Sequence, residues 1–192
     1  YDLFVKGEEL VGMIADVSGH NLGSALLMAM ARSVLRASLS QTPHPAEALE
    51  AANRLCLEEL EASGQFITCA CFRYHPRSRR LRYASAGHVP ALLWGPPHRS
   101  LEASGLPLGI VPELKLTEEE LALRPGQLLL LCTDGLIELR RGKDMLGTEG
   151  VWEMLRRWAP RGARGLIGAL RAELDGHRLR DDLTAVAIKV LG

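Results

Sequence analysis

The chain has 192 residues, and its 23 basic and 23 acidic side chains give a formal net charge of zero. Apolar residues make up 47% of it, which is enough for a substantial core and excludes a disordered, collagen-like or coiled-coil protein. A dedicated nucleic-acid-binding protein would usually carry a basic excess, so no nucleic-acid partner is expected. The length favours a single domain over residues 1–192.

The sequence contains no recognisable targeting segment. Its longest apolar run, 25–31, is far shorter than the roughly 18 residues that cross a bilayer, so we expect no membrane span in this chain. The four cysteines form no CxxC pair, and we expect them to be reduced core residues of a cytoplasmic protein. The chain begins at Tyr1 without a Met, which indicates a fragment.

The hydrophobic pattern predicts blocks of helices and blocks of strands. In chain order we expect a strand at 10–15, helices at 22–39 and 45–62, strands at 66–74, 81–86, 91–94, 114–123 and 128–132, helices at 148–158 and 164–174, and a strand at 183–190. Asn21 and its polar neighbours are typical of an N-cap, and the apolar start of the following helix predicts burial between other elements. Connections of hairpin length favour an α+β fold with mostly antiparallel sheet.

Acidic residues stand where three apolar strands meet turns. Asp16 ends the first strand, Asp134 follows the strand at 128–132, and Asp181 and Asp182 precede the last strand. If they converge, two charges 4 Å apart cost about 4 kcal/mol at an effective dielectric of 20. Either their pKa values rise or a cation lies between them. Oxygen ligands without His or Cys indicate Mg²⁺ or Mn²⁺.

Each of these residues also has a structural interpretation. Asp134 before a glycine is typical turn chemistry, Asp16 would stabilise the N-terminus of the next helix, and Asp181 would pair with a nearby arginine. His20 and His88 each follow a glycine, so they are candidates either for acid–base catalysis or for hydrogen bonding within a loop. The recurrence of acids at three strand ends is what favours the metal site.

Five motifs extend over nearly the whole chain. They are Asp16-Val-Ser-Gly-His20, Tyr83-Ala-Ser-Ala-Gly-His88, Gly105-Leu-Pro-Leu-Gly109, Leu123-Arg-Pro-Gly-Gln127 leading into Thr133-Asp134-Gly135, and Asp181-Asp-Leu-Thr184. In this order they resemble the SpoIIE/RsbU-type serine phosphatases, which belong to the PPM superfamily of type-2C-like, metal-dependent protein phosphatases. Asn21 departs from the pattern, because the family usually has Gly at that position.

The resemblance implies an α/β/β/α sandwich, with two packed, mostly antiparallel sheets flanked by helix pairs. It also implies two or more Mn²⁺ or Mg²⁺ ions and no organic cofactor. Asp16 would bridge two metals, the backbone carbonyl of Val17 would bind one of them, and Asp134 and Asp181 would hold the other, with Asp182 as a supporting acid. Asp16, Asp134 and Asp181 would then be the catalytic residues. A further Asp ligand of the family would lie before residue 1, so we expect a domain truncated at its N-terminus.

The implied activity is hydrolysis of phosphoserine or phosphothreonine on a protein. By analogy the substrate would be a phosphorylated STAS-type anti-anti-sigma factor in bacterial signalling, and an upstream sensor domain would control the enzyme. Such a site needs no protein nucleophile, because a water held by two cations is activated near neutral pH. Two alternatives stay open: a non-catalytic scaffold with a phosphatase fold that binds a regulatory partner, and a small-molecule phosphomonoesterase.

Overall fold

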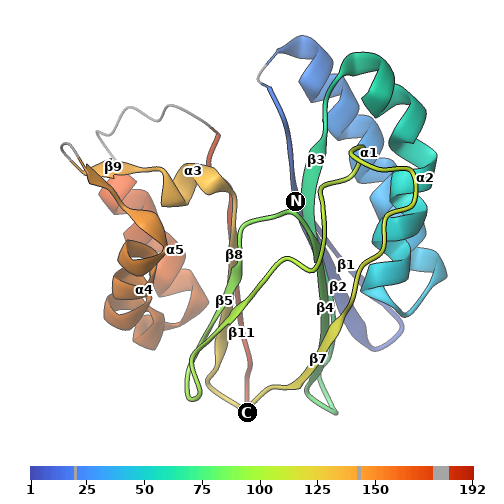
Figure 1. Cartoon of the computed structure of the whole chain (residues 1–192). Coiled ribbons are helices and arrows are strands. Elements are labelled where there is room, and N and C mark those ends of the chain that lie inside the picture. Colours follow the sequence, from blue (N-terminus) through green and yellow to red (C-terminus); the bar gives the residue numbers. More distant parts are fainter. Residues whose placement is uncertain (20, 142–143, 175–181) are drawn as a thin grey trace. The chain divides into compact units, whose positions relative to one another are not determined.

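The computed structural model describes residues 1–19, 21–141, 144–174 and 182–192 (Figure 1). By their internal contacts these residues form two compact units. Unit 1 comprises Tyr1–His88 and Glu102–Leu123, and unit 2 comprises Val89–Leu101 and Arg124–Gly192. Each unit contains one main sheet and a pair of long helices, so the predicted α+β class is confirmed.

Unit 1 is built on a five-stranded antiparallel sheet in the order β1-β2-β3-β4-β7. Its strands are β1 (Asp2–Lys6), β2 (Glu9–Val17), β3 (Ile67–His75), β4 (Arg80–Ala86) and β7 (Glu119–Ala122). The two central strands, β2 and β3, carry runs of buried apolar residues. Gly12 in β2 leaves space for the Phe72 ring of β3, since a Cβ there would lie 2.3 Å from it.

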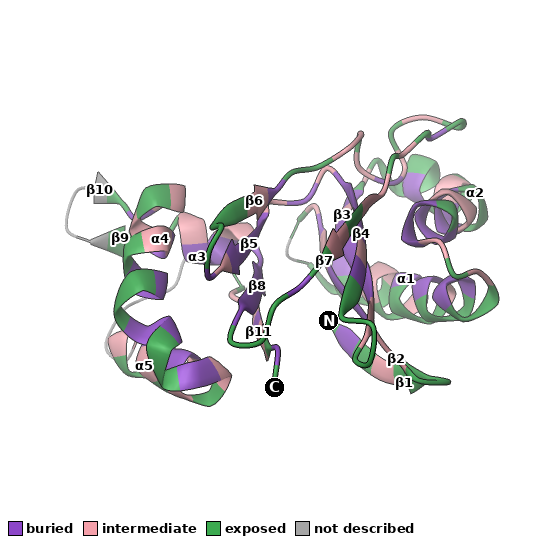
Figure 2. Cartoon of the chain, turned by 90° about the horizontal axis from the view of Figure 1, so that it is seen from below, coloured by how far each residue is buried: buried purple, intermediate pink, exposed green. Residues whose placement is uncertain are grey.

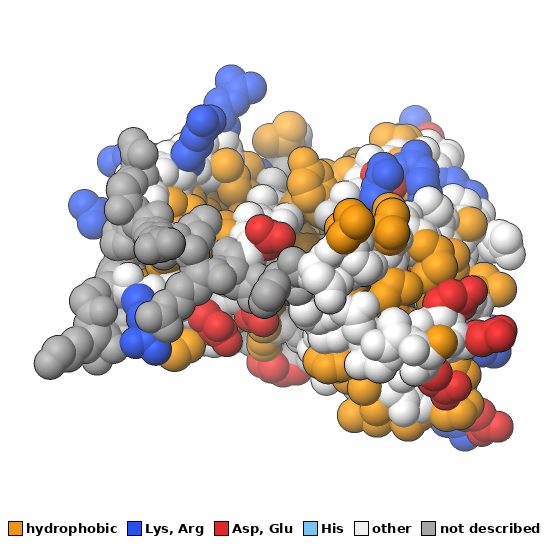
Figure 3. Space-filling view, turned by 90° about the horizontal axis from the view of Figure 1, so that it is seen from above, with side chains coloured by type: hydrophobic (Ala, Val, Ile, Leu, Met, Phe, Trp, Pro, Cys, Tyr) orange, Lys and Arg blue, Asp and Glu red, His pale blue; other side chains and the backbone are white. Residues whose placement is uncertain are grey.

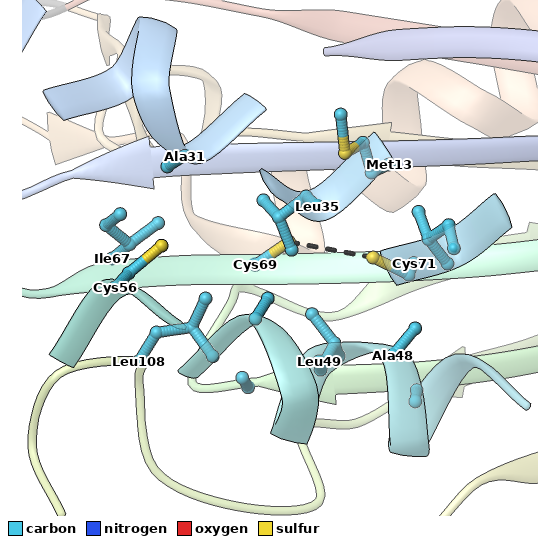
Figure 4. Packing of buried hydrophobic residues seen from close by; sticks show 14 of the residues in the cluster. Met13, Ala31, Leu35, Ala48, Leu49, Cys56, Ile67, Cys69, Cys71 and Leu108 are labelled. Atoms are coloured by element: carbon cyan, nitrogen blue, oxygen red, sulfur yellow. Dashed lines mark hydrogen bonds between the residues drawn. The ribbon is translucent and has the colours of Figure 1, made fainter. Parts of the chain in front are cut away.

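Two helices, α1 (Leu22–Gln41) and α2 (Pro45–Ser63), cover one face of this sheet (Figures 1 and 2). The core between the helices and the sheet is made by fully buried side chains from both layers, including Leu35, Leu49, Cys56, Cys69 and Cys71 (Figure 4). All four cysteines of the chain are described, and each is a buried, free thiol. Burial raises the pKa of Cys56 to about 11, so this thiol is not poised for reaction.

Helix α1 is less buried than its composition predicts. Leu22 and Leu26 in its first two turns are 78% and 65% exposed, so the expected burial between other elements is wrong for this end. Figure 3 shows apolar side chains among the charged ones on one face of the molecule. By length and composition alone, α1 is apolar enough to cross a membrane, although its Leu35 and Leu39 pack into the core of unit 1.

Unit 2 is built on a four-stranded antiparallel sheet in the order β11-β8-β5-β6. Its strands are β5 (Ala91–Trp94), β6 (Arg99–Leu101), β8 (Leu128–Cys132) and β11 (Ala185–Lys189), and β9 (Arg140–Arg141) pairs with β10 (Asp144–Met145) in a separate ribbon. In the described part of the chain after β8 lie the α-helices α3 (Asp134–Ile137), α4 (Gly147–Trp158) and α5 (Gly162–Leu174), with the 3-10 helix η1 (Ala159–Arg161) between α4 and α5. Helices α4 and α5 cover one face of the sheet and bury Leu155, Leu166 and Leu170 against it (Figure 1).

The predicted elements are largely confirmed, with differences that have physical causes. The expected strand at 114–123 is restricted to β7, because the Leu116 N–H donates to the Glu50 carboxylate of α2 rather than to a neighbouring strand. The expected turn after Thr133 is the short helix α3.

The sequence reading missed the edge strand β1, which is attached to α1 by a 2.7 Å hydrogen bond from Arg36 to Asp2. Burial alone would raise the pKa of Asp2, but the charges and hydrogen bonds of Arg36 and Arg32 lower it overall.

The buried Arg73 of β3 connects three parts of unit 1. Its guanidinium donates to the Glu9 carboxylate at 2.6 and 2.8 Å, and to the carbonyls of Leu39 and Thr42 at 2.8 and 2.7 Å. We predict that Arg73→Met lowers the free energy of unfolding by about 2–4 kcal/mol, because it leaves buried acceptors without donors. Urea denaturation measures this change.

Arg82 provides the matched control, since it pairs with Arg73 in the β3–β4 register but its side chain is 33% exposed. Arg82→Met should cost less than about 1 kcal/mol. Equal losses for the two variants would contradict a special structural role for Arg73.

Candidate functional site

In unit 1 the candidate site residues lie at the end of β2. Asp16 is the penultimate residue of β2, is partly exposed, and pairs in register with Thr68 of β3. The Thr68 hydroxyl lies 2.8 Å from Nδ1 of His88, which is 4% exposed. Antiparallel pairing therefore places a carboxylate, a hydroxyl and a buried imidazole at one end of this sheet, and Val17 follows as a buried residue.

The chain after Asp16 is held by reciprocal hydrogen bonds. The Ser18 N–H donates to the Phe66 carbonyl, and the Phe66 N–H donates to Oγ of Ser18, both at 2.9 Å. Gly19 then takes a φ of +95°, which favours glycine and turns the chain toward α1. The predicted N-cap is Asn21, whose side chain accepts from the Ser24 N–H at 2.9 Å. Ser18 thus closes the strand end rather than capping the helix.

In unit 2 the site is built where β8 and β11 begin to separate. The Thr133 N–H donates to the Thr184 carbonyl at 3.0 Å, and the Thr184 N–H donates to Oγ1 of Thr133 at 3.0 Å. The same hydroxyl lies 3.3 Å from the Asp182 carbonyl, to which it donates. Gly135 leaves room for this approach, because a Cβ there would lie 2.4 Å from the Asp182 carbonyl oxygen. We call these contacts the Thr133 clasp; it fixes the backbone of 182–184 beside Asp134.

Asp134 starts α3 directly after the Thr133 clasp, and one of its carboxylate oxygens is unsatisfied. Oδ1 of Asp134 is buried and has no hydrogen-bond partner in the described part of the chain. A buried carboxylate oxygen without a donor costs free energy, which a bound cation would offset. Burial, followed by the charge of Asp134, raises the pKa of the neighbouring Cys132 thiol to about 12. The Asp134 carboxylate thus adds to the effect of burial in keeping the Cys132 thiol protonated.

The predicted site residues are distributed between the two units. Asp16 and Val17 lie in unit 1, and Asp134 and Asp182 lie in unit 2, where the Asp182 side chain is exposed. Asp181 and His20 lie outside the described residues. Within the described ranges, no three His, Cys, Asp or Glu side chains gather into a metal site, so the ligand set remains a prediction.

Sequence reasoning missed Thr68 and Thr133, which make hydrogen bonds next to the predicted acids Asp16 and Asp134. Thr68 has no sequence signal, because its importance comes from the register that pairs it with Asp16. Thr133 directly precedes Asp134 in the sequence. A residue with a hydroxyl group next to a candidate metal ligand was therefore a signal from which its role could have been predicted.

We predict that Gly135→Ala separates the 182–184 segment from α3, because the added methyl group would collide with backbone rather than with a flexible side chain. Amide hydrogen exchange in the peptide 182–190 should become at least about tenfold faster. Gly168→Ala is the matched control, since Gly168 is an exposed residue of α5 with open space at its Cβ position. Unchanged exchange in Gly135→Ala would show that the Thr133 clasp does not need the close approach.

Comparison with known proteins gives consistent results. The profile of the family Stage II sporulation protein E (SpoIIE) matches residues 6–191. The chain is 28% identical over 196 residues to phosphoserine phosphatase RsbU of Bacillus subtilis, covering 98% of this chain but 58% of RsbU. It therefore spans little more than half of the length of that relative.

Solved structures with the same fold extend this comparison. The SiaA-PP2C domain of Pseudomonas aeruginosa superposes with a TM-score of 0.86 at 20% identity, covering 98% of this chain and 78% of that one. RsbX, crystallised in complex with magnesium, superposes with a TM-score of 0.71 at 18% identity, covering 96% of this chain and 83% of that one. These likenesses establish a PP2C-like fold. Because the family profile spans almost all of its residues, the chain belongs to the SpoIIE family.

Proposed function

We propose that this protein is a metal-dependent serine/threonine phosphatase that hydrolyses phosphoserine or phosphothreonine on a protein substrate. The single observation that carries the proposal is the buried, unpartnered Oδ1 of Asp134 at a strand end fixed by the Thr133 clasp. Membership of the SpoIIE family and the likeness to RsbU, a phosphoserine phosphatase, support the reaction type.

The residues available at the two strand ends fit a hard divalent cation. The proposed ligands are the carboxylates of Asp16, Asp134 and Asp181 and the carbonyl of Val17, with Asp182 in support; all are oxygen donors, which Mg²⁺ and Mn²⁺ prefer. We propose two or more such ions, consistent with the magnesium bound by RsbX. When bound, they would lower the pKa of a water and offset charge on the phosphoryl oxygens.

The remaining groups of the site have positioning roles in this proposal. The Thr133 clasp holds Asp134 and the start of β11 together, and the Thr68–His88 contact fixes β3 beside Asp16. A nucleophile from the protein is not needed. Oγ of Ser18 already accepts a backbone N–H, and the four thiols are buried, so the proposal assigns the attack on phosphorus to water rather than to Ser18 or a cysteine.

The relatives also support a proposal for the substrate and the setting. We propose that units 1 and 2 together form one phosphatase domain of a cytoplasmic signalling protein. Its substrate would be a phosphorylated STAS-type anti-anti-sigma regulator, and an upstream sensor domain would control it. The similarity to RsbU over 98% of this chain supports this choice.

We predict that Asp134→Asn lowers Mn²⁺-dependent release of phosphate from a phosphoserine STAS protein by at least about 100-fold. The fold should stay intact or become slightly more stable, because the substitution removes the charge of a half-buried carboxylate whose Oδ1 has no partner among the described residues. Phosphate release and thermal unfolding without metal measure the two effects. Glu138→Gln, an exposed carboxylate four residues later, is the control and should keep full activity.

Three results would contradict the proposal. Full activity in Asp134→Asn would remove Asp134 from the site. A protein that binds the phosphorylated partner without releasing phosphate would be the scaffold instead. Faster hydrolysis of free phosphoserine than of the phosphoprotein would identify a small-molecule phosphomonoesterase.

A further inference from the structure

A second candidate site lies within unit 2, in a pocket between the β5–β6 hairpin and helix α4. Its volume is about 320 Å³, near the lower limit for pockets that bind small molecules. The hairpin contributes Trp94, His98, Arg99 and Ser100, and α4 contributes the rest of the lining. The proposed reaction uses none of these residues.

Aromatic rings form the walls of this pocket. The ring of His98 lies 5.8 Å from that of Trp94 and 6.0 Å from that of Trp152, so three rings follow one another from the hairpin to α4. Both tryptophans are only partly buried. If these rings served only to pack the hairpin on α4, no open volume would be needed between them. A flat ligand would use both the rings and the space.

Helix α4 supplies charge to the same pocket. Glu149, Trp152 and Arg156 recur at spacings of three and four residues, which places them on one face of the helix. Both terminal nitrogens of Arg156 donate to one oxygen of Glu149, at 3.1 and 3.2 Å, so the guanidinium lies beside this carboxylate on the exposed face of α4. With Arg99 on the opposite wall, these three charged side chains leave a net charge of +1.

The donors of the pocket also favour an anion. The Gly95 N–H donates to Nδ1 of His98 at 3.0 Å, so the neutral ring carries its proton on Nε2 and offers a donor. Together with the guanidinium groups of Arg99 and Arg156, the lining contains N–H donors as well as aromatic rings. A ligand with an acceptor-rich anionic group and a flat ring is complementary to both features.

We propose that this pocket binds a small aromatic molecule carrying one carboxylate or phosphate group. The site is separate from Asp134. Trp94 pairs with Leu128 at the start of β8, whereas Asp134 follows the other end of that strand. The four residue steps from Leu128 to Cys132 span about 13 Å, and Asp134 lies two residues further on.

Isothermal titration calorimetry in EDTA tests the proposal without metal or turnover. The probes are AMP and indole-3-acetate as aromatic phosphate and carboxylate, adenosine and indole-3-ethanol as their uncharged counterparts, and inorganic phosphate as an anion without a ring. At least one aromatic anion should bind with a Kd below about 1 mM, and at least tenfold more tightly than its uncharged counterpart and than phosphate.

Variants then assign the binding to the pocket. Trp152→Ala and Arg156→Gln should each weaken binding of the aromatic anion at least about tenfold. Arg156 is an exposed residue, so its substitution keeps the fold even if Trp152→Ala does not. Arg171→Gln, an exposed arginine of α5 outside the lining, is the matched control and should bind like the parent protein. Asp134→Asn should also bind normally, which separates this site from the proposed phosphatase site.

Any of three results would overturn the proposal. They are a Kd above about 1 mM for both aromatic anions, equal binding of an anion and its uncharged counterpart, and binding that Arg156→Gln leaves unchanged.

Discussion

The site in unit 2 depends on one interaction, the pair of hydrogen bonds that Thr133 and Thr184 exchange at the end of β8. It determines where the last strand begins, and it brings the Asp182 backbone against Gly135. Asp134 is thereby held at a position where one carboxylate oxygen is buried without a donor among the described residues. The protein keeps this unfavourable carboxylate because, in our proposal, a divalent cation binds it.

Unit 1 uses the same principle with different groups. The register of β2 and β3 sets Thr68 opposite Asp16, and the Thr68 hydroxyl lies within hydrogen-bond distance of the buried His88. Buried apolar strands supply the rigidity, and threonine hydroxyls at their ends make hydrogen bonds beside the acids. Rigid sheet ends are better suited than mobile loops to hold ligands at the distances that a metal ion requires.

The sequence predicted well those elements whose burial is visible along the chain. The continuous apolar runs of β2 and β8 and the helical spacing in α2 were identified with boundaries close to those observed. The edge strand β1 was missed; its residue Asp2 is bound by Arg36, which is distant in sequence. The prediction of a strand over the whole of 114–123 was too long for a similar reason, since Glu50 of α2 binds the Leu116 N–H.

Asp16 and Asp134 were found from their places at the ends of apolar strands. The roles of Thr68 and Thr133 become visible only once the strand register is known.

The measurement that tests the central claim most directly is the anomalous diffraction of a crystal soaked in Mn²⁺. We expect a manganese peak within about 2.5 Å of a carboxylate oxygen of Asp134. Manganese bound only at other places, or a soaked crystal in which Oδ1 of Asp134 is satisfied by a protein donor, would contradict the assignment of Asp134 as a metal ligand.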